Sequence, residues 1–551
     1  MSKILAGKKI HLLKSNYLSM KLLPIGIQHF EPLIQKQYIY VDKTKLIYRL
    51  VKGGGAYFLS RPRRFGKSLL VDTLRHIFLG NQHLFKDLWI YDKIEWQTHP
   101  IIHLDFSTLS YQQKGLEAAL CKKLRKIGKT YEVTLEGDDA KELLEDLIEQ
   151  LSKETPVALL IDEYDKPIID YITDLPKANH NLNILREFYS GLKALGDKLS
   201  ILFITGIAKF SKVSLFSVLN HLTDLTLHKD YAALTGITQT ELQLYFGAYI
   251  QQAANQFKVS ETQLIAQLKT MYDGYSWDGK TFVYNPFSLL HFFDERSFKN
   301  YWFSTGTPNF LVQLLRSNRM RTDSLEQQIV SDSFFETFDI RYGIDVYLLL
   351  FQAGYLTVTE LKETVEEVQY TIGYPNKEVQ QSLLRNLIQA FTFKEATIVH
   401  TALLELEKAF QNRQVKEITQ QLNVLFSDMS YLFHPLEKKE KKQERVQQEF
   451  IAWEGWFHTV IHLVLQFMSI RIDCEVTKHE GRIDAIVQVP NYLYIIEFKL
   501  SDATTALTQI KDRKYAHSYR NSSKEVILMG IAFNKKKRVV EDIEWEVWDR
   551  A

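Results

Sequence analysis

The chain has 551 residues, of which 45% are hydrophobic and 24% are charged, and its formal net charge is +2. These proportions are typical of globular proteins and exclude disorder throughout, and the length suggests roughly three to four domain-sized units. The low net charge excludes a strongly basic chain, so any surface for nucleic acid must be local. The two cysteines, Cys121 and Cys474, cannot form a disulfide framework or a four-thiolate zinc site.

Residues 1–23 are expected to form a weakly amphipathic N-terminal arm. The first 14 residues, up to Lys14, contain no apolar core long enough for a signal peptide. No apolar stretch approaches about eighteen residues without a polar interruption, so a membrane-spanning segment is not expected. We therefore predict a cytoplasmic protein without a membrane partner.

The first chemical motif is the segment 60–68, which reads SRPRRFGKS. A short apolar strand is predicted before it, and a helix is predicted after it at 69–79. A strand, a turn ending in Gly-Lys-Ser and a helix form the context of a P-loop, in which helix amides and a lysine bind phosphates. The usual motif has a glycine where this chain has Arg61, which weakens the motif match. An ordinary helix start is the alternative.

The last six residues of this motif and the first residue of the helix are predicted to bind the nucleotide: Arg63, Arg64, Phe65, Gly66, Lys67, Ser68 and Leu69. Ser68 is in addition a predicted Mg²⁺ ligand, because its hydroxyl follows the P-loop lysine. The guanidinium groups of Arg61, Arg63 and Arg64 could add positive charge around a triphosphate, or they could serve a different anion.

A second motif supplies the acids that a nucleotide site needs. The segment 155–165 reads TPVALLIDEYD, an apolar run that ends in Asp162 and Glu163 and predicts a buried parallel strand. Asp162 is predicted to hold Mg²⁺ and Glu163 to polarise the attacking water. Thr205 ends another apolar run and stands where a polar sensor of the γ-phosphate is expected. Together with an apolar run at 101–106, these motifs predict an ATP-binding α/β domain over 24–235.

The middle of the chain is predicted to be helical. A helical lid is expected over 236–330, and its first helix begins with a capping box at Thr238 and Glu241. The aromatic, turn-rich loop at 272–280 is expected to serve packing rather than catalysis. A helical connector is expected over 331–430, where the heptad-like stretch is too short for a coiled coil.

Two apolar strands joined by a two-residue break are predicted over 481–499. Counting outward from that break places Asp484 directly opposite Glu497. Cross-strand Cβ atoms lie roughly 4.5–5.5 Å apart, close enough for two carboxylates to hold one divalent cation. Lys499 is two residues beyond Glu497 and therefore shares its face. The pattern predicts a metal site, and the alternative is an ordinary hairpin with a surface ion pair.

This hairpin resembles the core of the PD-(D/E)XK nuclease superfamily. The resemblance implies that Asp484 and Glu497 bind magnesium and that Lys499 helps to activate the attacking water. It also implies that Glu454, on a helix-length apolar segment upstream, is a further metal-site acid.

A downstream segment, 506–515, resembles the helix that follows the core strands of such nucleases. It carries Gln509 and Tyr515, which are candidates for supporting the site. With the upstream segment, these features place a nuclease-like domain over 431–551.

Motifs along nearly the whole chain from about residue 24 resemble the bacterial AAA-ATPase-like family, which is usually fused to a C-terminal PD-(D/E)XK nuclease. They are the segments 23–30, 40–44, 58–68, 161–167, 203–211, 271–277, 284–290, 301–306 and 373–379. In that family the glycine-poor loop is itself typical. The resemblance implies bacterial proteins for which roles in mobile elements or defence are inferred.

We therefore expect an α/β protein in which an ATP-binding P-loop domain is joined to a Mg²⁺-dependent nuclease acting on nucleic acid, DNA in preference to RNA. ATP and Mg²⁺ are the expected cofactors, and a homo-oligomer is a further expectation. The expected catalytic residues are Glu163, Asp484, Glu497 and Lys499. Two alternatives remain: a nucleotide-dependent switch whose nuclease-like domain only binds nucleic acid or a partner, and an ATP-driven nucleic-acid remodeller.

Overall fold

The computed structural model describes residues 20–549 apart from 210–221, 305–327, 336–344, 366, 393, 427–459, 468–470, 479–480, 501, 535–536 and 538. The chain divides into two compact units. Of the described residues, unit 1 comprises those up to Ser304 and from Gln328 to Val379, and unit 2 comprises those from Gln380 onward. Each unit contains a five-stranded sheet.

The sheet of unit 1 is parallel, with the strand order β2-β3-β4-β1-β5. Its strands are β1 (Gly55–Ser60), β2 (Ile101–Asp105), β3 (Val157–Asp162), β4 (Leu199–Gly206) and β5 (Thr223–Asp224). Every residue of β3 is buried, as expected for a central strand covered on both faces. The predicted parallel α/β domain is thereby confirmed.

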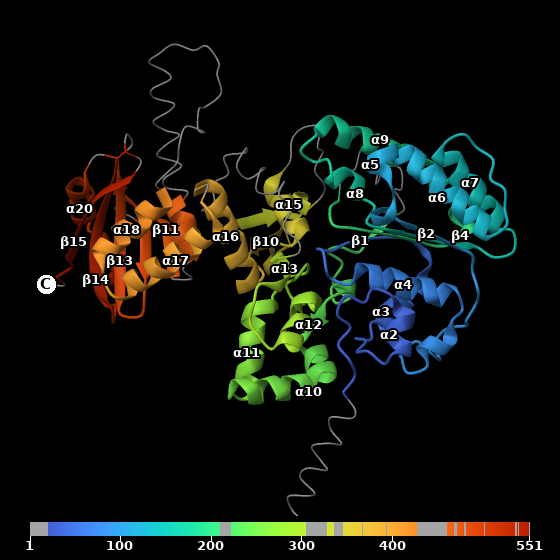
Figure 1. The fold of residues 1–551 in the computed structure, drawn as a ribbon, viewed down its shortest axis with the longest axis horizontal. Coiled ribbons are helices and arrows are strands. Elements are labelled where there is room, and N and C mark those ends of the chain that lie inside the picture. Colours follow the sequence, from blue (N-terminus) through green and yellow to red (C-terminus); the bar gives the residue numbers. More distant parts are fainter. Residues whose placement is uncertain are drawn as a thin grey trace, which may run out of the picture. The chain divides into compact units, whose positions relative to one another are not determined.

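Helices cover both faces of this sheet (Figure 1). One face carries α2 (Phe30–Gln35), α3 (Thr44–Gly53) and α4 (Lys67–Phe78). The other face carries α5 (Tyr111–Lys114), α6 (Leu116–Thr130), α7 (Ala140–Leu151), α8 (Lys166–Ile169) and α9 (Leu175–Ser190). The helices of the first face pack on alternate strand residues such as Leu59, Leu160 and Phe203, which form one apolar core.

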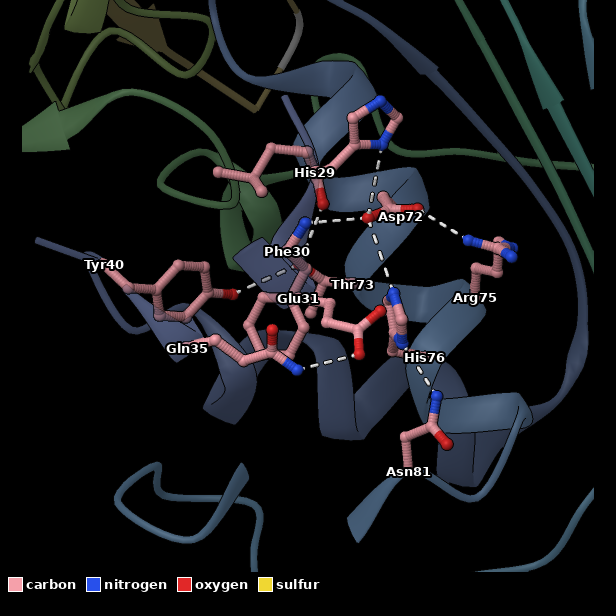
Figure 2. Close-up of polar contacts among 11 residues, drawn as sticks. His29, Phe30, Glu31, Gln35, Tyr40, Asp72, Thr73, Arg75, His76 and Asn81 are labelled. Atoms are coloured by element: carbon pink, nitrogen blue, oxygen red, sulfur yellow. Dashed lines mark hydrogen bonds and ion pairs between the residues drawn. The ribbon is translucent and has the colours of Figure 1, made fainter. Parts of the chain in front are cut away.

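Helix α4 is tied to α2 by the buried side chain of Asp72 (Figure 2). Its carboxylate accepts a hydrogen bond of 2.7 Å from the amide of Phe30, the first residue of α2. The same carboxylate lies 3.2 Å from Nη1 of Arg75 and 3.7 Å from Nε2 of His76. Because no side chain caps α2 from its own N-cap position, Asp72 satisfies an amide there and adds a favourable negative charge.

A helical region follows in unit 1, with α10 (Gln239–Phe257), α11 (Glu261–Tyr272), α12 (Pro286–Glu295) and α13 (Tyr301–Ser304). Two short strands, β6 (Ile237–Thr238) and β7 (Val283–Tyr284), pair at its base. The predicted capping box is present: Thr238 Oγ1 accepts from the amide of Glu241, whose carboxylate accepts from the amide of Thr238 at 2.8 Å. The predicted helical middle region is confirmed.

The start of the predicted connector contains strands that the sequence did not lead us to expect. A three-stranded antiparallel sheet joins β8 (Gln328–Ser331), β10 (Val368–Gly373) and β9 (Thr357–Glu363), with α15 (Val346–Ala353) between them in sequence. The connector is therefore not helical throughout. The strands are short and rich in threonine, valine and isoleucine, residues that favour a pleated surface.

The sheet of unit 2 has the order β11-β12-β13-β14-β15 and is antiparallel except between β13 and β14. Its strands are β11 (Arg471–Lys478), β12 (Gly481–Gln488), β13 (Tyr492–Lys499), β14 (Glu525–Asn534) and β15 (Val539–Val547). Helix α20 (Ala503–Asp512) provides the crossover that a parallel β13–β14 pair requires.

Alternate residues of β13 face different helices of unit 2. Leu493 and Ile495 pack with α20, whereas the hydroxyl of Tyr494 donates to the carbonyl of Phe410 at 2.7 Å. Phe410 lies on α17 (Ala396–Gln411), which packs on α18 (Val415–Phe426). The heptad-like stretch of the predicted connector lies in α17, one face of which, including Leu403 and Leu406, is buried. One further helix, α16 (Lys377–Thr392), crosses the boundary between the units in sequence.

Candidate nucleotide and metal sites

The hairpin of β12 and β13 has the predicted register. The strands pair as Ala485 with Ile496 and Gln488 with Leu493, and the same register places Asp484 opposite Glu497. Asp484 Oδ2 accepts a hydrogen bond of 2.9 Å from the amide of Phe498, which fixes the Asp484 side chain across the strand pair. The geometry expected from the two-residue break is therefore present.

Glu497 is the centre of this cluster. Its carboxylate accepts from Nζ of Lys499 at 3.2 Å and from the side-chain amide of Gln509 on α20. Tyr515 is buried beside Gln509. These four side chains share the α20 face of the sheet, so the structure brings together Glu497, Lys499 and both predicted supporting residues.

The electrostatics of Glu497 favour a cation. Its side chain is 3% exposed, and its second carboxylate oxygen, Oε2, has no hydrogen-bond partner among the described residues. Burial, together with the nearby Asp484 carboxylate, raises the pKa of Glu497 to about 7, and Lys499 opposes the rise. A buried, unsatisfied carboxylate oxygen is costly, and a divalent cation would offset that cost.

The donor set fits magnesium. Mg²⁺ keeps several waters and is usually bound through one or two carboxylates, which Asp484 and Glu497 can supply. The predicted third acid, Glu454, lies outside the described residues. Within the part of the chain that the structure describes, no three His, Cys, Asp or Glu side chains cluster as a metal site.

In unit 1 the P-loop motif occupies the turn between β1 and α4. Gly66 has φ 85° and precedes the first helical residue, Lys67, so the amides of the first turn point toward the loop. Ser68 and Leu69 take the next two helical positions. Arg64 is exposed and also has a left-handed backbone, with φ 67°.

Lys67 is bound by its own loop. Its ammonium donates to the carbonyls of Arg61 and Pro62, both at 2.9 Å. Burial lowers the pKa of Lys67, while the carboxylates of Asp162 and Glu163 oppose that shift. A phosphate oxygen would have to compete with the two carbonyls for this ammonium group.

The acids of the second motif lie at the carboxyl end of β3, as predicted. Strand β4 separates β3 from β1, so Thr205 on β4 lies next to Asp162. The Thr205 hydroxyl donates to the carboxylate of Asp162, and both side chains are buried. Glu163 has φ 53°, an uncommon conformation for a residue other than glycine, and burial raises its pKa. Backbone strain of this kind is frequent at functional sites.

Asp165 is a structural neighbour of these acids. Its carboxylate accepts from the amides of Ile207 and Ala208 at 2.8 and 2.6 Å, just beyond the end of β4. Burial raises its pKa to about 6, and the two amides oppose that rise. Through these contacts Asp165 holds the backbone of the two residues after β4 in place.

Arg61, which replaces the usual glycine, does not face a nucleotide. Its side chain is fully buried and stacks on Trp277, with Cζ 3.8 Å from the ring centroid. The guanidinium donates to the carbonyls of Ser60 and Thr226 at 2.8 and 2.9 Å. Of the roles left open for Arg61, a contribution to the charge around a triphosphate is disfavoured, because this group is committed to packing and to backbone carbonyls.

Aromatic residues that the sequence did not assign to the site support the loop from behind. Phe65 is buried against the edges of Tyr275 and Trp277, and the indole nitrogen of Trp302 donates to the carbonyl of Arg63 at 3.0 Å. The 272–280 loop therefore serves packing, as expected, and it packs against the P-loop. The aromatic and arginine content of the two motifs is the signal that could have linked them.

Comparison with known proteins also separates a nucleotide-binding part of the chain from a nuclease-like part. Residues 24–216 match the family described as predicted AAA-ATPase, and residues 452–543 match the PD-(D/E)XK nuclease superfamily. The chain is 33% identical over 531 residues to a protein of Azotobacter chroococcum mcd 1 named "Uncharacterized protein in vnfD 5′region", an alignment that covers 95% of this chain and 98% of that protein. No solved structure matches the chain.

No helix in the described ranges is long and apolar enough to cross a membrane. The similarity to the Azotobacter protein extends over both units and both matched domains. The chain therefore belongs to the predicted AAA-ATPase family and carries a C-terminal domain of the PD-(D/E)XK nuclease superfamily.

Proposed function

We propose that unit 2 is a Mg²⁺-dependent nuclease that cleaves phosphodiester bonds in nucleic acid, DNA in preference to RNA, and that unit 1 binds and hydrolyses ATP to control it. The observation that carries the nuclease proposal is Oε2 of buried Glu497, which has no hydrogen-bond partner among the described residues and lies opposite Asp484 on one face of the sheet. In cells, defence or mobile-element biology is the proposed setting, by family resemblance alone.

A bound Mg²⁺ would lower the pKa of a water and neutralise charge that develops on the phosphate. Asp484 and Glu497 would hold that ion, with Glu454 a proposed further ligand. Gln509 orients one oxygen of Glu497 through its hydrogen bond and leaves the other oxygen for the ion. Lys499, already 3.2 Å from Glu497, would position the attacking water or stabilise the developing negative charge.

In unit 1, Lys67 would transfer its hydrogen bonds from loop carbonyls to phosphate oxygens, with the amides from Arg63 to Leu69 around them. Ser68 and Asp162 would hold Mg²⁺, and Glu163 would accept a proton from the attacking water. Thr205 on β4, which is hydrogen-bonded to Asp162, would act as the polar sensor of the γ-phosphate.

Labelled single- and double-stranded DNA and RNA, incubated with the full chain with and without Mg²⁺ and ATP, test this proposal. Wild type should cleave DNA only with Mg²⁺. Asp484→Asn should lower the rate by about a thousandfold or more, since loss of metal catalysis removes several kcal/mol of transition-state stabilisation. Lys499→Ala should slow cleavage while leaving Mg²⁺ affinity largely unchanged.

Cleavage of no nucleic acid by wild type would contradict the nuclease proposal. Nucleic acid bound without cleavage, combined with normal ATP binding, would instead favour the alternative of a nucleotide-dependent switch. ATP hydrolysis stimulated by nucleic acid without cleavage would favour a remodeller.

A further inference from the structure

A basic hollow lies on unit 1, along α6 and beside α9. Its volume is about 850 Å³. Five cationic side chains line it, namely Lys114, Lys122, Arg125, Lys126 and Lys129. All five are exposed. Because the whole chain carries a net charge of only +2, this is a strong local concentration of positive charge.

The helix geometry places most of these charges on one stripe. At 3.6 residues per turn, Lys122, Arg125, Lys126 and Lys129 fall within about 100° of the α6 circumference. Lys122 and Lys129 are separated by a rise of roughly 10 Å along the axis. Successive phosphates of one DNA strand are spaced about 3.4 Å apart along the duplex axis, so this rise spans about three phosphate spacings.

The positive charge of the hollow is only partly offset by its own lining, because five cations less two acids, Glu117 and Asp138, leave a net charge of +3. No described carboxylate forms an ion pair with any of the five cations. Of the two lining acids, Glu117 accepts a 2.6 Å hydrogen bond from the amide of Ala140, which commits it to the start of α7. Arg125 donates to the carbonyl of Gly137 at 3.2 Å, a contact that holds the side chain without cancelling its charge.

We propose that this basic hollow binds the phosphate backbone of nucleic acid. No phenylalanine, tyrosine or tryptophan among the described residues lines it, so binding should rest on phosphate contacts rather than base stacking and should not depend on sequence. None of the exposed large apolar residues of the described chain lines it either, which disfavours a membrane surface as the ligand. The proposal adds a nucleic-acid contact on the ATPase unit to the metal site of unit 2.

This binding-site proposal shares one assumption with the proposed function, namely that the protein acts on nucleic acid. The full-length triple variant Lys122→Gln/Lys126→Gln/Lys129→Gln should be compared with Lys45→Gln/Arg49→Gln/Lys52→Gln. The control removes three exposed charges at the same spacing from α3, in the same unit and away from the hollow. Melting curves should establish that both variants fold.

Binding should be measured by fluorescence anisotropy with a labelled duplex in EDTA, over a series of salt concentrations. The α6 variant should bind about tenfold or more weakly, and its slope of log affinity against log salt should fall by about two to three. The α3 variant should match wild type. The triple arginine variant at the three α6 positions, which keeps the charges, should retain binding.

Equal losses in the α6 and α3 variants would overturn the proposal, because only total charge would then matter. Undiminished binding by the α6 variant would also overturn it. So would a competition experiment in which polyglutamate displaces the labelled duplex as effectively as unlabelled DNA does. Wild type that binds DNA through α6 but never cleaves it would refute the nuclease proposal and leave this site standing.

Discussion

In unit 1 the side chains of Lys67 and Asp162 already have hydrogen-bond partners within the chain, whereas in unit 2 a buried carboxylate oxygen has none among the described residues. Lys67 donates to two loop carbonyls, and Thr205 donates to Asp162. The oxygen without a described partner is Oε2 of Glu497, which lies opposite Asp484 in the strand pair. The two sites should therefore respond differently to their ligands.

This difference has a physical consequence for binding. A nucleotide in unit 1 must displace existing hydrogen bonds, so the cost of breaking them lowers its net binding free energy. A cation in unit 2 relieves a desolvated charge that the fold already carries, so it should add stability directly.

The largest effect in unit 1 is expected for Glu163→Gln. The amide keeps the size of the side chain but cannot accept a proton, so ATP turnover should fall by about 10²–10⁴-fold while ATP stays bound. Steady-state hydrolysis and calorimetry would measure the two properties, and Glu187→Gln, at an exposed position of α9, is the matched control. Normal hydrolysis by Glu163→Gln would remove this residue from the proposed mechanism.

The two neighbouring arginines of the P-loop should behave in opposite ways when replaced by glycine. Arg61→Gly restores the commoner motif but deletes a fully buried side chain and its stacking on Trp277, so it should destabilise unit 1 by about 3 kcal/mol or more. Arg64→Gly relieves a left-handed backbone at an exposed position and should change stability by less than about 1 kcal/mol.

Urea unfolding of the two glycine variants would measure this contrast. An Arg61→Gly variant as stable as wild type would show that the buried guanidinium does not support the loop.

Lys67→Ala should weaken ATP binding about tenfold or more, because a charge-assisted hydrogen bond contributes roughly 1.5–3 kcal/mol. The present contacts of Lys67 with the loop carbonyls should reduce the loss toward the lower end of that range. Calorimetry with Lys86→Ala as an exposed control would measure it. Wild-type affinity in Lys67→Ala would contradict the assignment of the P-loop.

The pH dependence of unit 2 should reveal the desolvated acid. The pKa of Glu497 is raised to about 7, above its unfolded value of about 4.3, so the stability that its protonation contributes is fully present below about pH 4.3 and is lost as the pH rises through about 7. Glu497→Gln should remove this decline and stabilise the metal-free protein at pH 8 by up to about 3 kcal/mol.

Melting temperatures in EDTA between pH 5 and 8 would test the effect, with Glu544→Gln as the exposed control on β15. Parallel pH profiles for wild type and Glu497→Gln would contradict the assigned electrostatics.

The sequence predicted these sites where local rules determine position. The two-residue break fixed the register that sets Asp484 opposite Glu497, and the apolar run of β3 placed Asp162 at a strand end. The location of Arg61 could not be predicted, because Trp277 lies more than two hundred residues away in the chain. Long-range packing overrides the local expectation that a loop arginine faces phosphate.

The strands β8 to β10 were missed for two reasons. Strand β8 pairs with β10 from a segment distant in sequence. The β9–β10 hairpin is local, but its strands are short and β9 carries glutamate and lysine residues that also suit a helix. The basic stripe of α6 was overlooked because the net charge of the chain hides a local cluster that becomes apparent only when one helix face is exposed.

Mg²⁺ binding without nucleotide tests the central claim most directly. Calorimetry and melting curves at pH 8 should show that Mg²⁺ binds and stabilises wild type, and that Asp484→Asn and Glu497→Gln each lose at least about tenfold in affinity. Asp162→Asn, which alters the proposed magnesium ligand in unit 1, should retain the wild-type response. If wild type shows neither heat nor thermal shift, or if both unit 2 variants bind Mg²⁺ as wild type does, Asp484 and Glu497 are not a metal site.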